Sequence, residues 1–173
     1  MPTPHELLAR IIELDNHPSD HAFNELLPLM SHADPAIRLA AVESLGDMTY
    51  RAAGPVLSAV LHDPDPEVRV AALEALAAHE DPAAASNIEP LLYDSVQEVR
   101  VAAVNALMDM ELEPSVPALA GLLTDPDQII RHQAVLALGE IGGALAMQYL
   151  AGVSDDPSPD VRINAISILD ETD

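Results

Sequence analysis

The sequence predicts an all-α fold, an α-solenoid (superhelix) of five helix pairs with a period of 31 residues, preceded by a capping helix. Three observations support this prediction. An arginine recurs every 31 residues without insertion or deletion, apolar residues make up 49% of the chain, and aromatic residues make up only 2%. Alanine and leucine dominate the apolar set. Both are strong helix formers, and they suit closely packed helices better than a core of mixed secondary structure.

The repeat shows in several columns of the sequence. The arginines at the 31-residue spacing are Arg38, Arg69, Arg100, Arg131 and Arg162. A β-branched aliphatic residue precedes each of them, alanine follows three positions later, and leucine follows seven positions later. Leucine or isoleucine also stands twelve positions before each arginine. Columns that keep their spacing five times predict one structural unit that is repeated five times.

The second helix of each pair is expected to begin in a turn just before the arginine. Asp65 suits the N-cap position, and Pro66 suits the first helical position. Asp34 and Asp127 stand at the position equivalent to Asp65, whereas Val96 departs from the pattern. Apolar residues at spacings of three and four then mark the face that the helix turns toward the core.

The first helix of each pair is shorter, for example residues 117–123, and often carries a proline near its start. Pro28 and Pro90 lie further inside and are expected to bend their helices. A leading helix over about residues 4–14 has no partner repeat, so we expect it to cap the N-terminal end. The prediction amounts to about 11 helices.

These units predict a single domain over residues 1–173. The capping helix falls in residues 1–19, and the five repeats fall at about 20–48, 49–79, 80–110, 111–141 and 142–173. The last helix carries Ile163, Ile166 and Ile168, and Ile168 occupies a column that holds serine or alanine elsewhere. We expect this column to face a following repeat. The C-terminal helix is therefore a candidate for self-association or for contact with a partner.

The motif at residues 63–76 reads Asp-Pro-Asp-Pro-Glu-Val-Arg-x-Ala-Ala-x-x-Ala-Leu. It resembles the HEAT-like repeat of the phycobilisome lyase type, and the resemblance extends over about residues 20–172. The resemblance implies a superhelix of helix pairs. It implies a function only loosely, since this repeat serves many unrelated roles.

The arginine column predicts a structural ladder. Each arginine lies about one turn into a helix, where the helix dipole disfavours a cation, so acidic partners are needed. Aspartates stand both six and four positions before most of the arginines. We expect ion pairs that run from repeat to repeat, in preference to a row of arginines that binds phosphate. The expected members are Arg38, Arg69, Arg100, Arg131, Arg162, Asp34, Asp65 and Asp127.

No catalytic or metal motif is complete. Deoxyhypusine hydroxylase has a similar repeat and carries its iron ligands as His-Glu pairs directly after the repeat arginine. Here only His132 matches, and Gln133 replaces the glutamate. The Asp-x-Asp pairs lack the turn glycine of a calcium loop. The chain has no cysteine. We therefore predict no cofactor, no metal and no catalysis.

The charge balance restricts the partners. The chain has 29 acidic residues against seven arginines and no lysine, a formal net charge of −22. Phosphate contacts need clustered basic residues, so we expect no binding to nucleic acid. No apolar run approaches the roughly 20 residues that cross a membrane, and the N-terminal sequence has no secretory signal pattern. A cytoplasmic location is the default expectation.

The surface expected to bind a partner is the concave face, lined by the second helices. Positions one, five and nine after the arginine should point outward there. Aliphatic residues at position one either form an exposed stripe beside an acidic row or lie half-buried between neighbouring helices. The predicted contact residues are Leu39, Glu43, Asp47, Val70, Glu74, Val101, Asn105, Asp109, His132, Gln133, Leu136 and Ile163.

Three functional interpretations follow. The first is a non-catalytic scaffold or assembly factor that grips a basic or amphipathic segment of another protein. The second, implied by the resemblance, is an accessory subunit of a lyase or of a chromophore-handling enzyme. The third explains the acidic, lysine-free surface by adaptation to salt alone.

Overall fold

The computed structural model describes residues 2–48 and 53–171. Contacts group the chain into two compact units, Met1–Asn87 and Ile88–Asp173, and each is described by itself. The predicted boundary at residue 49 lies outside the described residues, and the single domain over residues 1–173 stays a prediction. None of the described helices combines the length and the apolar character that crossing a membrane requires.

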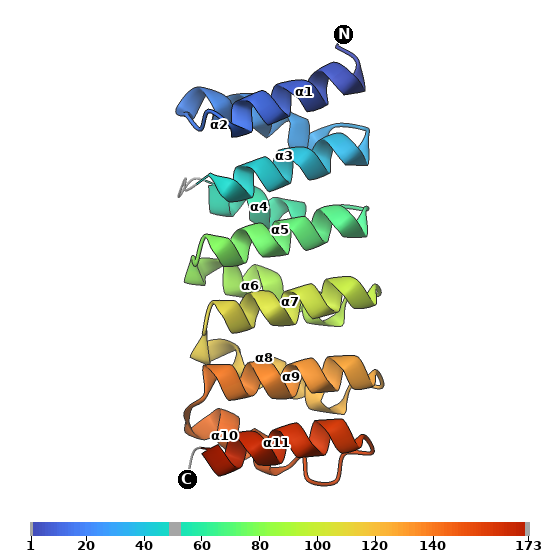
Figure 1. Cartoon of the computed structure of the whole chain (residues 1–173), viewed down its shortest axis with the longest axis vertical. Coiled ribbons are helices and arrows are strands. Elements are labelled where there is room, and N and C mark those ends of the chain that lie inside the picture. The colour runs from blue at the N-terminus through green and yellow to red at the C-terminus, as the bar shows by residue number, and fades with distance from the viewer. Residues whose placement is uncertain (1, 49–52, 172–173) are drawn as a thin grey trace. The chain divides into compact units, whose positions relative to one another are not determined.

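All the regular elements in the described residues of the first unit are helices. Its elements are α1 (Pro4–Asp15), α2 (Asp20–Leu26), the 3-10 helix η1 (Leu27–Ser31), α3 (Pro35–Asp47), α4 (Ala53–Val60), α5 (Pro66–Ala78), η2 (Pro82–Ala84) and the start of α6 (Ala85–Ile88). The helices α1, α3 and α5 lie side by side in one layer (Figure 1), with α1 packed on α3 and α3 on α5. The short helices α2 and α4 form the second layer.

The second unit repeats the same plan. Its elements are η3 (Glu89–Tyr93), α7 (Gln97–Asp109), η4 (Glu113–Ser115), α8 (Val116–Gly121), η5 (Leu122–Thr124), α9 (Gln128–Ile141), α10 (Gly143–Ala151) and α11 (Pro159–Glu171). Here α7, α9 and α11 form one layer, and α8 and α10 form the other. The described residues thus contain the predicted 11 α-helices, together with five short 3-10 helices.

The second helix of a pair begins where the turn residues predicted it. The side chains of Asp34, Asp65 and Asp127 each accept a hydrogen bond, 2.9–3.0 Å long, from the main-chain N–H two residues later. Each satisfies one N–H that the first helical turn leaves without a partner. Val96 stands at the same position before α7 and provides no side-chain cap. The prediction from the Asp-Pro turns is confirmed.

The first helices are shorter and less regular than a continuous α-helix. At Pro28 and Pro90 the chain passes from α-helix into the 3-10 helices η1 and η3, instead of bending within one helix. Proline removes a main-chain donor and crowds the preceding turn, which ends the α-helical pattern at that point. The predicted helix over residues 117–123 also divides, into α8 and η5, although no proline stands at that junction.

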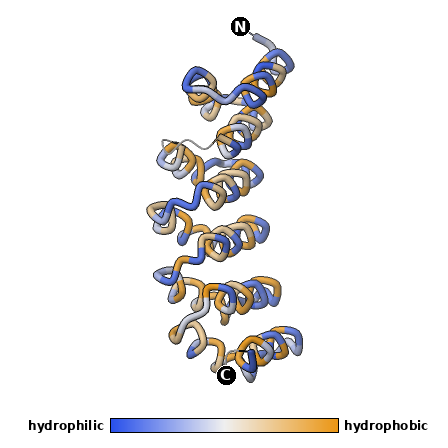
Figure 2. Tube along the Cα trace, turned by 60° about the vertical axis from the view of Figure 1, so that its left-hand side comes forward, coloured by the Kyte–Doolittle hydropathy of each residue, from blue (hydrophilic) through white to orange (hydrophobic). Residues whose placement is uncertain are grey.

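The repeated columns form the core. The β-branched residue before each arginine and the alanine three positions after it are at most 1% exposed in all five repeats. The leucine seven positions after the arginine is fully buried in α3, α5, α7 and α9 and half-buried in α11. Figure 2 shows hydrophobic and hydrophilic segments alternating along each helix. Each fully buried leucine contributes roughly 1.5–3 kcal/mol, so these columns drive the packing of the repeats.

Candidate protein-binding surface

The repeat arginines first hold the turns of the solenoid. Nη1 of each arginine donates a hydrogen bond to the main-chain carbonyl six residues earlier, which lies in the turn before the same helix. This bond is 2.8–3.0 Å long for Arg38, Arg69, Arg100 and Arg131. An arginine here therefore satisfies a turn carbonyl that has no partner within the helix.

Arg38 and Arg131 also make buried ion pairs with the following repeat. Arg38 donates through Nε and Nη2 to the two carboxylate oxygens of Asp63, each at 2.7 Å. Arg131 pairs with Asp156 in the same two-bond geometry, at 2.8 and 3.1 Å. A lysine could not reproduce this planar arrangement.

The acids of the ladder differ from those in the expected set. The buried partners are the aspartates six positions before an arginine, whereas Asp34 and Asp65 cap helices. Asp127 caps α9 and also lies 3.5 Å from Nη2 of Arg100, a longer and more exposed contact than the other two pairs. Because Asp63 and Asp156 also accept hydrogen bonds from the main-chain N–H two residues later, they fix the turn and pair with the neighbouring repeat at once.

The ion pairs shift the pKa values of their members. Burial tends to raise the pKa of Asp63, but the hydrogen bonds from Arg38 and from the N–H of Asp65 hold this pKa below its usual range. The hydrogen bond from Arg131 lowers the pKa of Asp156 in the same way, against the opposing effect of burial. Both carboxylates are therefore ionised at neutral pH, and both arginines have raised pKa values.

The outward positions of the first unit combine acids with half-buried aliphatic residues. Glu43, Asp47 and Glu74 are exposed on α3 and α5. Leu39 and Val70, one residue after their arginines, are half-buried. The aliphatic residues of this unit are thus partly covered and lie among exposed acidic side chains. They do not form a fully exposed stripe.

The second unit has a similar pattern with more polar residues. Asp109 on α7 is exposed, while Val101 and Asn105 on the same helix are half-buried. The predicted residues of α9, which are His132, Gln133 and Leu136, are also half-buried. Ile163 on α11 differs from all of them, because 62% of its surface is exposed.

The difference at Ile163 comes from the side on which the next helix packs. In α3, Gly46 lies against Ala75 of α5, and in α9, Gly139 lies against Ile168 of α11. Positions one and four after the arginine are on the same side of a helix as these glycines. A following helix therefore covers part of position one. On α11 position four is Ile166, which is 50% exposed, whereas this column is fully buried in the four preceding second helices.

These contacts correct the expectation for Ile168. Its column faces the preceding repeat, since its side chain lies against Gly139 of α9. The residues of α11 that lack a covering helix among the described residues are Ile163 and Ile166. Any contact made by the C-terminal helix is therefore expected at this pair and not at Ile168.

A groove of about 330 Å³ runs between the N-terminal halves of α9 and α11. Ile129 and Ile163 line it with His132, Asn164 and Asp160. The side-chain amide nitrogen Nδ2 of Asn164 lies 2.6 Å from Nε2 of His132, so that the two side chains are paired with each other. The groove thus combines two exposed aliphatic side chains with a paired polar group.

The contact residues predicted from the sequence include His132 and Ile163 but not Ile129 or Asn164. Ile129 stands in a column that holds an acid in three of the other repeats, and 50% of its surface is exposed. Asn164 stands in a column that holds alanine in the first three repeats, and Ile166 stands where other repeats hold their most buried residues. Departures from the repeat are the signal that identifies these positions, whereas the predicted contact residues rested on its regularity.

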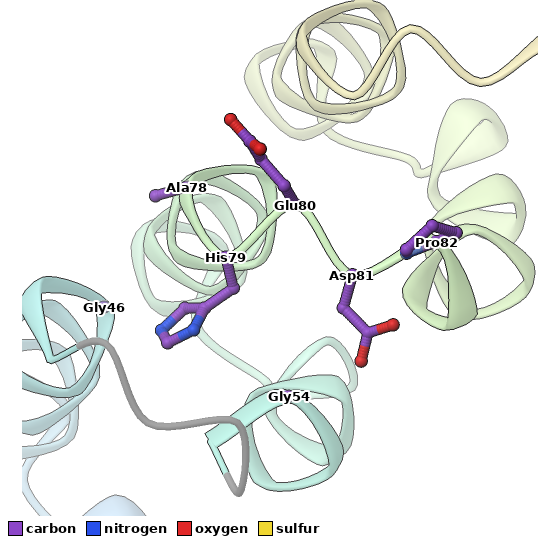
Figure 3. Close-up of a pocket in the computed structure, with 7 residues that line it drawn as sticks. All are labelled: Gly46, Gly54, Ala78, His79, Glu80, Asp81 and Pro82. Atoms are coloured by element: carbon purple, nitrogen blue, oxygen red, sulfur yellow. The ribbon is translucent and has the colours of Figure 1, made fainter.

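A cavity of about 400 Å³ lies in the first unit, at the point where α3 ends, α4 begins and α5 leads into η2. Figure 3 shows the side chains of His79 and Asp81 directed into it and Glu80 directed away. His79 Nε2 lies 3.4 Å from the carbonyl of Leu45, and Asp81 caps η2. Both polar groups therefore have structural roles. Among the described residues, no three His, Asp or Glu side chains are placed to hold one metal ion.

The sequence matches the family of HEAT repeats in three overlapping stretches, residues 23–108, 54–136 and 91–170. Together these stretches extend over most of the chain. This protein belongs to the HEAT repeat family. None of the curated protein sequences matches it.

Solved structures give the same fold for this HEAT repeat protein. The Escherichia coli protein YibA has a TM-score of 0.73 at 20% identity, over 97% of this chain and 70% of that chain. The complex of CpcE and CpcF of phycocyanin lyase from Nostoc sp. PCC7120 gives 0.68 at 20% identity, over 87% and 99%. A designed armadillo repeat protein in complex with the peptide (KR)4 gives 0.70 at 19% identity, over 99% and 95%. The predicted α-solenoid and its resemblance to repeats of the lyase type are confirmed.

Proposed function

We propose that this HEAT repeat protein is a non-catalytic scaffold that binds a basic, amphipathic segment of another protein. The segment contacts the outward positions of the second helices of the pairs. The observation that carries the proposal is the separation of charge, because the repeat arginines donate into the turns while acids of the second helices, such as Glu43 and Glu74, remain exposed.

The second unit shows this separation clearly. Its three arginines are Arg100, Arg131 and Arg162, and each donates to a turn carbonyl. The side chains of Arg100 and Arg131 are 17% and 10% exposed. Asp109 and Glu140, by contrast, are exposed at the ends of α7 and α9. A surface with this distribution attracts a positively charged segment and speeds its association.

The half-buried aliphatic residues supply the apolar part of the contact. Leu39, Val70 and Val101 each keep part of their surface open between acidic neighbours. Covering apolar surface contributes about 25 cal/mol per Å² before the costs of ordering are subtracted. A segment with aliphatic residues on one face and basic residues at its borders fits both features.

The structural neighbours are consistent with this use of the fold. One designed repeat protein of the same fold is in complex with a peptide of alternating lysine and arginine. The CpcE and CpcF structure is a complex of two chains of phycocyanin lyase, and the match extends over 99% of the matched chain. That match supports a second candidate function, an accessory subunit of a lyase or chromophore-handling enzyme that acts through a partner chain.

The proposal is tested with a probe peptide of about 18 residues, five helical turns, in which leucines form one face and lysines form the other. Glu43→Gln with Glu74→Gln should slow its association with the protein, because these acids flank the outward face of α3 and α5. Stopped-flow fluorescence measures the rate. Added salt should reproduce the loss in the unmutated protein.

The matched control is Glu113→Gln with Asp155→Asn, which removes the same charge from exposed positions outside the second helices. Equal slowing by both pairs would show that the acidic surface attracts cations without a specific face. That result would favour salt adaptation as the reason for the charge and would contradict the proposal.

A further inference from the structure

The groove between α9 and α11 has a composition that the repeat itself does not require. In the first three second helices, the two residues after the arginine are an aliphatic residue and an alanine. In the last two they are His132-Gln133 and Ile163-Asn164. Polar groups replace small apolar ones at positions where an alanine would pack without desolvating any polar atom.

Ile129 is the second departure. It stands in the first turn of α9, two residues before the arginine, where α5, α7 and α11 carry an acid that favours the positive end of the helix dipole. Isoleucine gives up this favourable charge and is half exposed instead, at 50%. The side chain of Ile129 neither caps α9 nor lies buried in the core.

Charge around the groove is one-sided. Asp160 lines it, and the two arginines of these helices, Arg131 and Arg162, donate to turn carbonyls at Asp125 and Asp156. Arg131 is further held by the carboxylate of Asp156. An occupant therefore meets aliphatic side chains, a paired His–Asn group and negative charge.

We propose that this groove, defined by Ile129, His132, Asp160, Ile163 and Asn164, is the anchoring site for an amphipathic helix with a basic border. The inference rests on the proposed function and gives it a location. An aliphatic side chain of the helix inserts between Ile129 and Ile163, and a lysine or arginine beside it approaches Asp160. The His132–Asn164 pair lies at the floor of the groove and keeps its polar atoms satisfied while water is displaced.

The test uses two peptides of identical composition. The first is the leucine–lysine peptide with its leucines on one helical face, and the second contains the same residues with the leucines spread around the helix. Isothermal titration calorimetry at 0.15 M salt gives the dissociation constants. Wild-type protein should bind the amphipathic peptide at least about tenfold more tightly than the scrambled one.

The variants replace isoleucine by a neutral polar residue, so that charge attraction to the peptide is unchanged. Ile129→Gln and Ile163→Gln should each weaken binding of the amphipathic peptide by about tenfold and leave the scrambled peptide unaffected. The control is Ile12→Gln, because Ile12 on α1 is 64% exposed and Ile163 is 62% exposed. This control should change the dissociation constant by less than about twofold. Circular dichroism melts confirm that all three variants fold.

The outcomes separate the inference from the proposed function. Tight binding of the amphipathic peptide that survives both groove variants overturns the location and leaves the proposed function standing. Equal affinity for the two peptides overturns both. Light scattering that shows a dimer of the protein which Ile163→Gln dissociates, together with no peptide binding, assigns the groove to a second copy of the chain and also overturns the inference.

Discussion

Arginine at the repeat position does two tasks that no other side chain can combine. Nη1 satisfies a turn carbonyl of its own repeat, while Nε and Nη2 reach the carboxylate of the next repeat where the geometry allows. The aspartate that receives them also fixes the turn through the main chain. One residue pair thus couples a local turn to the packing of neighbouring helices, which explains why arginine stands at this position of the repeat.

The arginines are not equivalent, and their substitution should show it. Arg131→Met should destabilise the protein by about 3 kcal/mol, because it leaves the carboxylate of Asp156, only 5% exposed, without its cation. Arg100→Met should cost only about 1 kcal/mol, since its contact with Asp127 is 3.5 Å long and its Nε has no hydrogen-bond partner. Thermal or urea melts measure both. Equal losses at the two positions would contradict the distinction drawn from these distances.

At the scale of the element, the second helices were predictable almost to the residue. Asp65 and Pro66 gave the start of α5, and the spacing of the arginine column gave the remaining starts. The first helices were less predictable, because a proline inside a short helix can either bend it or convert it to 3-10 geometry. Pro28 and Pro90 do the latter, an outcome that depends on how the following turn packs.

The orientation of each helix was the harder part of the site. Hydrophobic periodicity showed which residues of a helix lie outside the core, but it did not show which side of that helix the following helix covers. Gly46 and Gly139 carry that information, since each lies against a residue of the following second helix. For this reason Ile168 was assigned to the wrong side of α11.

Close approach at Gly46 gives a test at this scale. A Cβ atom there would lie 2.8 Å from Cβ and 3.3 Å from Cα of Ala75, a residue with no flexible end to move away. Gly46→Ala should therefore destabilise the protein by about 1–3 kcal/mol, although alanine favours a helix over glycine. Urea unfolding measures the loss.

Gly54 in α4 is the control for this substitution. A Cβ atom at Gly54 would meet only Asp81 Oδ2, at 3.5 Å, which is an ordinary contact. Gly54→Ala should therefore leave stability unchanged or raise it by up to about 1 kcal/mol. If Gly46→Ala were as well tolerated as Gly54→Ala, the packing of α3 on α5 would not depend on the missing side chain.

At the scale of the whole molecule, the repeat uses its charges unevenly. The chain carries 29 acids and seven arginines, and each of the five repeat arginines donates a hydrogen bond to a turn carbonyl. Some of the acids stand at outward positions of the second helices, such as Glu43, Glu74 and Asp109. Packing and turn geometry account for the repeat arginines, whereas these three acids form no ion pair with any of the described residues, and we therefore propose that they serve recognition.

The most direct test of this account maps where a basic, amphipathic helix binds. Isotope-labelled protein is titrated with the leucine–lysine peptide at 0.15 M salt, and backbone amide shifts are followed by NMR. We predict that the shifted amides cluster on the second helices α3, α5, α7, α9 and α11, with the largest changes near Ile129 and Ile163. Shifts that cluster instead on α2, α4, α8 and α10, or that the scrambled peptide reproduces equally, would contradict the central claim.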